Sequence, residues 1–285
     1  MSFQETVLLG ALAGFTLYLG LPFARLRVLG NRGRVALSMF SVGVLAFLFV
    51  DVFEHAFAIV GDSVTAYKDG KQGIGEAIGL AALLGVGFAA GTAGLASIDR
   101  LRPKPPKPPP VAGGSAEALP AGVAARIAAE ADDARQRALQ TGMIIATAIG
   151  LHNFAEGLAI GVAANTGEIG LATVLIIGFA LHNATEGFGI VGPLGAVRPS
   201  WRWLALVGLI GGGPTFVGSM VGYNVSSEPL QLAFYAVAGG AILFVIGEVW
   251  NAMRRFGHRE VGLWMLTAGF MVGILTDLVV VYGGG

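Results

Sequence analysis

Residues 139–164 read LQTGMIIATAIGLHNFAEGLAIGVAA, and residues 169–192 read IGLATVLIIGFALHNATEGFGIVG. Each stretch is long enough to cross a bilayer as an α-helix, which needs about 20 mostly apolar residues. Each also carries histidine, asparagine and glutamate in its interior, in the shared pattern L-H-N-x-x-E-G. Because ionisable residues inside a membrane span are costly, this duplicated pattern marks the first candidate for a functional site.

Apolar runs of similar length recur along nearly the whole chain. The sequence therefore predicts an all-α polytopic membrane protein with eight transmembrane helices. The eight predicted spans are residues 4–24, 35–60, 74–98, 139–164, 169–192, 201–224, 229–253 and 260–282.

The composition excludes several other classes of protein. Of the 285 residues, 54% are hydrophobic and 13% are charged, against roughly a quarter charged in a typical soluble domain. The formal net charge of zero leaves no overall basic surface for nucleic acid. The chain has no cysteine, so disulfides, thiolate metal sites and cysteine nucleophiles are absent.

The positions of lysine and arginine predict the orientation of the spans. Of the 18 basic residues, all except Lys68 and Lys71 fall in alternate loops on one side of the predicted bundle. By the positive-inside rule that side is cytoplasmic. We therefore expect a multi-pass protein of the cell (plasma or inner) membrane with both termini outside.

One hydrophilic segment, residues 99–138, interrupts the apolar pattern. Its first half holds most of the prolines, which is typical of an extended linker, although a binding role stays open. Its second half, residues 123–140, is rich in alanine and predicts a helix that continues into the fourth span. The expected organisation is three helices in 1–98, the cytoplasmic linker in 99–138, two metal-site helices in 139–192 and three helices in 193–285.

The spacing of the repeated pattern places its polar side chains on one face of each helix. His152 and Glu156 are four residues apart, and so are His182 and Glu186, so each pair stacks on one face. If the two helices face each other, two imidazoles, two carboxylates and two amide oxygens converge. That donor set, without thiolate, suits divalent zinc, iron, manganese and related ions. The predicted metal ligands are His152, Asn153, Glu156, His182, Asn183 and Glu186.

Two other interpretations of these residues stay open from the sequence. Each His–Glu pair could be a structural contact between helices. Alternatively, the cluster could belong to a membrane metallohydrolase that activates a metal-bound water. Against that enzyme, the sequence contains no H-E-x-x-H motif.

Other ionisable residues fall inside the predicted spans. Asp51, Glu54 and His55 lie toward the outer half of the second span, where they are candidates for an ion entrance. Glu248 in the seventh span is a candidate neighbour of the metal site. Asp277 lies near the outer end of the eighth span, where solvation alone would explain it.

The motif in the fourth span and its repeat in the fifth resemble the ZIP (Zrt/Irt-like protein) family of divalent metal-ion transporters. The eight spans, outward termini and long loop after the third span are similar to that family too. The resemblance implies a 3+2+3 arrangement of helices with inverted repeats, alternating access, and transport of zinc, iron(II), manganese or cadmium into the cytoplasm. It implies transport rather than catalysis, with homodimers common in the family.

The sequence departs from the pattern of family members that hold two adjacent metals. Such members carry an extra carboxylate in the sixth span, where this chain reads Gly213-Pro214-Thr215-Phe216. They also carry an aspartate at the position of Asn183. We therefore expect one strong site and at most a weak second one, touching Thr215.

Overall fold

The computed structural model describes residues 1–26, 30–100, 121–167, 169–225 and 227–282. Every regular element among these residues is a helix, and eight helical segments are long and apolar enough to cross a membrane. The predicted all-α class and the eight spans are therefore confirmed. A helix satisfies its own backbone hydrogen bonds, which is what a bilayer without water requires.

The first three spans differ in how regular they are. The first span is broken into α1 (Phe3–Phe15), α2 (Leu17–Gly20) and a short turn at Leu21–Arg25, which contains Pro22. The second is the long helix α3 (Asn31–Lys68). The third is α4 (Ile74–Ala89), which continues through a π-helical turn, η2 (Ala90–Gly94), into α5 (Leu95–Arg100).

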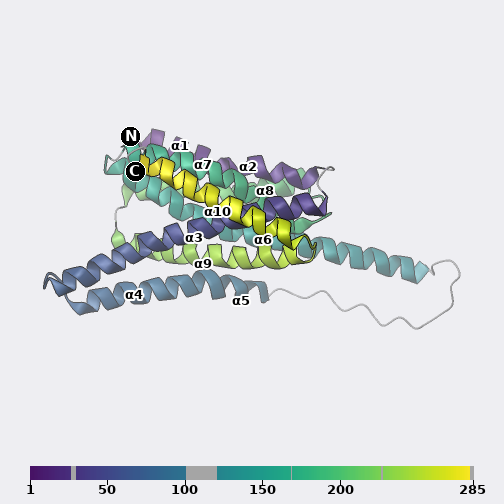
Figure 1. The fold of residues 1–285 in the computed structure, drawn as a ribbon, viewed down its shortest axis with the longest axis horizontal. Helices are drawn as coiled ribbons and strands as arrows, with labels where there is room; N and C mark the ends of the chain where they lie inside the picture. The colour runs from purple at the N-terminus through teal and green to yellow at the C-terminus, as the bar shows by residue number, and fades with distance from the viewer. Residues whose placement is uncertain (27–29, 101–120, 168, 226, 283–285) are drawn as a thin grey trace.

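The remaining spans are single helices. They are α6 (Ala121–Asn165), α7 (Ile169–Val191), which is followed by a short turn (Gly192–Leu194), α8 (Trp201–Asn224), α9 (Glu228–Arg254) and α10 (Arg259–Tyr282). Residues 123–140 belong to α6, and this part of the helix projects beyond the bundle (Figure 1). Of the expected linker, residues 101–120 lie outside the described part of the chain.

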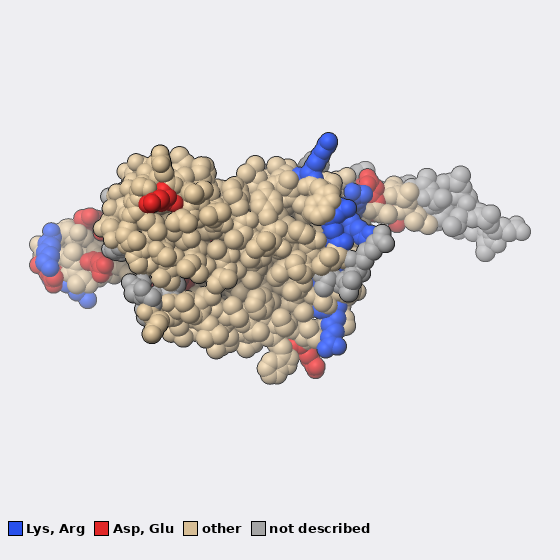
Figure 2. All heavy atoms as spheres, turned by 90° about the horizontal axis from the view of Figure 1, so that it is seen from above, with Lys and Arg blue, Asp and Glu red and all other residues tan. Residues whose placement is uncertain are grey.

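The two ends of the bundle differ in charge. The N-terminus and the end of α10 at Tyr282 lie at one end, and α6 projects from the other (Figure 1). Figure 2 shows basic side chains gathered at the end from which α6 projects, which we call the basic end. There the Arg25 guanidinium lies 4.9 Å from the centroid of the Trp201 ring, and Arg34 donates to the Gly195 carbonyl. We call the opposite end, which carries the α6–α7 turn, the open end.

Glycines set which helices touch backbone to backbone. Among the described glycines, contacts too close for a Cβ join α1 to α8, α2 to α7 and α6 to α8. A second set joins α3 to α10, and α9 to η2. Small residues allow this approach between membrane helices. In the two repeated motifs, Gly157 and Gly161 face α8, and Gly187 faces Gly20, so these glycines do not bring α6 against α7.

Candidate metal centre

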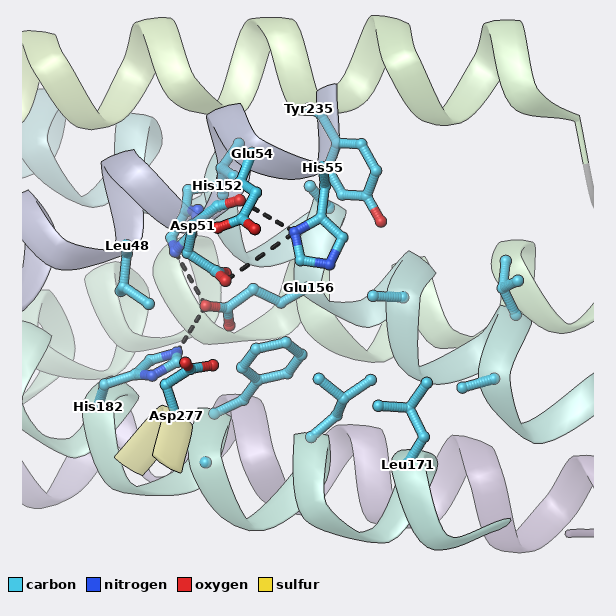
Figure 3. A pocket seen from close by; sticks show the side chains of 18 of the residues that line it. Leu48, Asp51, Glu54, His55, His152, Glu156, Leu171, His182, Tyr235 and Asp277 are labelled. Carbon is cyan, nitrogen blue, oxygen red and sulfur yellow. Dashed lines mark hydrogen bonds and ion pairs between the residues drawn. The ribbon is translucent and has the colours of Figure 1, made fainter. Parts of the chain in front are cut away.

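The centre of the bundle holds three ligand groups from two helices. His152 and Glu156 come from α6 and His182 comes from α7, and one ligand atom of each lies within 4.8 Å of the others. Glu156 Oε1 lies 2.9 Å from His152 Nε2 and 2.6 Å from His182 Nε2 (Figure 3). The i, i+4 spacing accounts for the first contact, and the packing of α7 beside α6 supplies the second.

Glu186 approaches the same group from α7. Its Oε1 lies 3.8 Å from His152 Nε2. Its other oxygen accepts a hydrogen bond of 3.3 Å from Asn153 Nδ2, which also donates to the Gly211 carbonyl at 3.0 Å. Asn153 therefore links the Glu186 carboxylate to α8 through these two hydrogen bonds, and its side chain lies beside the cluster.

Asn183 is turned away from its expected partners. Its amide nitrogen donates to the Ala13 carbonyl of α1 at 3.2 Å. The structure thus brings five of the six predicted ligand residues into one network and directs the sixth toward α1. The two amide side chains therefore do not converge as expected, because Asn183 lies in the contact between α1 and α7.

All of these side chains are buried, and several of their polar atoms lack a partner. His152, Glu156, His182 and Glu186 are each at most 6% exposed. Among the described residues, the atoms without a hydrogen-bond partner include His152 Nδ1, Glu156 Oε2, Glu186 Oε1, Asn153 Oδ1 and Asn183 Oδ1. Buried polar groups are normally satisfied. A set of unpaired oxygens beside two imidazoles therefore suits a cation.

A cavity of about 470 Å³ leads from this cluster to the open end. Its lining runs along α6 from His152 to Ala163 and includes Thr166 just beyond that helix. On α7 it runs from His182 to Leu171 (Figure 3). Both runs end at the α6–α7 turn, so the cluster lies at the inner end of the cavity. His152, Glu156 and His182 therefore line the inner end of a cavity that extends toward the open end.

Three predicted entrance residues, Asp51, Glu54 and His55, line this cavity. His55 Nδ1 lies 2.9 Å from the Asp51 carbonyl oxygen and 3.9 Å from the Asp51 carboxylate. Asp277 of α10 lines the same cavity, although the sequence interpretation treated it only as a solvated end residue. The packing of α10 against α3, with Gly273 beside Phe47, places Asp277 and Asp51 at one level, and the sequence does not show this packing.

Two predicted neighbours of the site are not in the described lining of the cavity. Thr215 is fully buried on α8, where it packs against Gly14 and Gly157. It is one helical turn from Gly211, whose carbonyl accepts from Asn153. Glu248 is half-buried on α9, 13 residues beyond the lining residue Tyr235 in the direction of the basic end. At 1.5 Å per residue this is a rise of about 20 Å.

An eight-span helical bundle with a buried His–Glu cluster at the inner end of a cavity is an arrangement that a membrane transporter for a divalent metal ion requires. Comparison with known proteins agrees. Residues 114–275, more than half of the chain, match the family model described as ZIP zinc transporter. The chain therefore belongs to the ZIP family.

Individual relatives carry corresponding names. The chain is 29% identical over 274 residues to the zinc transporter ZupT of Corynebacterium glutamicum, covering 91% of this chain and 95% of that protein. It is 35% identical over 146 residues to the zinc transporter GufA of Myxococcus xanthus, covering 48% of this chain and 56% of that protein.

The family assignment removes one of the alternatives that the sequence left open. ZIP proteins are transporters, so the chain is a multi-pass membrane protein of metal-ion transport and not an enzyme. The alternative of a membrane metallohydrolase is therefore wrong.

Proposed function

We propose that the chain carries zinc through the His152–Glu156–His182 cluster, with Glu186 and Asn153 completing the site. The observation that carries the proposal is the convergence of three ligand atoms within 4.8 Å at the inner end of the cavity. Zinc accepts imidazole nitrogen and carboxylate oxygen at about 2.0–2.2 Å. Iron(II), manganese and cadmium accept similar ligands and are the expected competing cargoes.

The charges of the site match a divalent ion. Glu156 and Glu186 supply two carboxylates, which offset the charge of the ion that they take out of water. Asp51, Glu54, His55 and Asp277 add polar groups along the approach. The ion thus exchanges its hydration shell for protein ligands in steps.

The transport cycle that fits this site is alternating access. The cavity serves entry from the open end, which the distribution of basic residues assigns to the outside. The closed side of the cluster must then open toward the basic end, which is the cytoplasmic end in this proposal. The 3+2+3 organisation with inverted repeats, the location in the plasma or inner membrane and a homodimeric assembly are parts of the same proposal.

Zinc uptake into sealed vesicles that contain the purified chain tests the function. We expect time-dependent accumulation that excess cadmium or iron(II) suppresses and that magnesium, which prefers an octahedral shell of oxygens, leaves unchanged. Stoichiometric zinc binding without accumulation would show that the cluster holds metal but does not transport it.

A further inference from the structure

The cavity stops at the metal cluster, and the protein beyond the cluster is packed. Asn153, Asn183 and Glu186 are fully buried and lie outside the described lining of the cavity. An ion that enters from the open end therefore needs a second route to the basic end. The inference below concerns that route and rests on the proposed function.

Toward the basic end from Glu186, α7 faces α3 through two glycines. A Cβ added to Gly189 would lie 2.9 Å from Ser41 Oγ. Gly192, which directly follows α7, lies against Ser38 so closely that a Cβ has no room. Because Ser38 and Ser41 are three residues apart, they share one face of α3. Their side chains and the two glycines form what we call the α3–α7 seam.

The hydroxyls in this seam lack hydrogen bonds. Ser38 and Ser41 are both fully buried, and neither Oγ has a partner among the described residues. A serine or threonine hydroxyl in a helix can bond the carbonyl three or four residues back, as Thr276 does on α10. The Ser38 and Ser41 oxygens make no such bond, so their lone pairs are available as ligands for an ion or its water.

The seam ends in a second, small cavity. This cavity of about 20 Å³ is lined by Arg34, Ser38, Phe188 and Gly192, among others, and lies near the basic end. Its volume is enough for about one water molecule. From the cluster toward the basic end, the order is therefore Glu186, Ser41, Ser38 and then the small cavity.

We propose that the α3–α7 seam is the route by which the metal ion leaves the cluster toward the basic end, with the hydroxyl oxygens of Ser41 and Ser38 as its successive contacts. The seam is closed in this structure, because each serine contacts the opposite glycine. The closest glycine-to-backbone contacts of α7 are with α2, and those of α3 are with α10, so the seam lies between two sets of closely packed helices. Separation of α3 from α7 therefore leaves the backbone contacts within each set intact.

The absence of cysteine gives a direct test, because one introduced cysteine is the only thiol in the chain. The test variant is Ser41→Cys, and the matched control is Ser219→Cys. Ser219 is also fully buried against a glycine, Gly10, but its hydroxyl donates to the Phe216 carbonyl at 2.8 Å. An Arg259→Cys variant at the start of α10 identifies the side from which a membrane-impermeant cationic thiol reagent meets the basic end.

During zinc uptake, we expect reagent on the Arg259 side to modify Ser41→Cys about tenfold faster than Ser219→Cys, since only the seam opens in the cycle. The modification should also stop uptake. Equal rates for the two cysteines, in Ser41→Cys protein that takes up zinc, would overturn the exit route. Zinc uptake by the unsubstituted chain would still support the proposed function in that case.

A Ser41→Ala variant decides the matter if the cysteine variant does not fold. We expect severalfold slower uptake with an unchanged or higher thermal midpoint, because an unpaired buried hydroxyl is removed. The control Ser219→Ala should lower the midpoint, because a hydrogen bond is lost, and keep the uptake rate per folded protein. Uptake by Ser41→Ala at the wild-type rate would contradict the proposal.

Discussion

At the scale of single residues, Glu156 is the most connected group in the centre of the bundle. One of its oxygens touches both imidazoles, and the other has no partner in the described chain. Asn153 holds Glu186 beside this pair through one amide nitrogen. The cluster is therefore organised before an ion arrives, although its members come from two helices and are fixed by a third.

The sequence predicts part of this arrangement. The spacing of His152 and Glu156 fixes their shared face, because helix geometry alone sets it. The contact between His182 and Glu156 depends on how α7 is rotated against α6, and the repeated motif only suggested it. The direction of Asn183 was not predictable, because it follows from the nearness of the Ala13 carbonyl, a group distant in sequence.

Asn153→Ala tests the support that this side chain gives to Glu186. We expect the free energy of unfolding without metal to fall by about 1–3 kcal/mol, because two buried acceptors lose their donor. The comparison variant is Asn224→Ala, whose amide donates to the nearby Met220 carbonyl at 2.7 Å at the exposed end of α8. Thermal unfolding of both variants in detergent measures the difference. An equal loss of thermal stability in the two variants would show that the hydrogen bonds of Asn153 contribute no more than the exposed one of Asn224.

At the scale of helices, paired glycines hold α6 against α8. Gly157 and Gly161 of α6 meet α8 backbone, and Gly218 and Gly222 of α8 meet α6 backbone. The sequence shows the small residues and so predicts close packing. It does not show which helix is the partner, because any apolar helix with a small stripe satisfies the same pattern. The choice of α8 rather than α7 as the partner of Gly157 and Gly161 is therefore visible only in the structure.

Gly218→Ala is expected to weaken the α6–α8 contact. A Cβ there meets the Phe154 carbonyl and lies 3.0 Å from the Leu158 nitrogen, and overpacking of this kind costs about 1–3 kcal/mol.

Gly247→Ala on α9 is the matched control, because a Cβ there meets nothing within 4 Å. It should be neutral or stabilise by about 0.5–1 kcal/mol, as alanine does in place of glycine in a helix interior. A lower thermal midpoint for both variants would indicate that helix–helix contact is not the cause.

At the scale of the whole molecule, the spans were the most predictable feature. Length and apolar composition determine a membrane helix almost without reference to its neighbours, so all eight appear in the structure. The cavity was not predictable, since five helices contribute to its lining. Asp277 was missed for the same reason, because its role depends on α10 packing against α3.

The separation of basic residues predicts the orientation in the membrane. A single cysteine at Asp69, in the α3–α4 turn, should react with impermeant thiol reagent on intact cells. The Arg259→Cys variant should react only after the membrane is permeabilised. The reverse pattern would place the open end of the cavity in the cytoplasm and would reverse the proposed direction of transport.

The central claim is that the His–Glu cluster carries the transported ion. Its most direct test is the initial rate of zinc uptake by Glu156→Ala, with Glu76→Ala at the exposed start of α4 as the control. Glu156 offers a ligand oxygen to the ion, so its loss should reduce the uptake rate by more than the about 10–100-fold that removal of an outer-shell partner of a metal site costs. We predict that Glu156→Ala reaches the membrane in normal amount and loses uptake to this extent, while Glu76→Ala keeps the wild-type rate. Normal uptake by Glu156→Ala would contradict the assignment of the cluster.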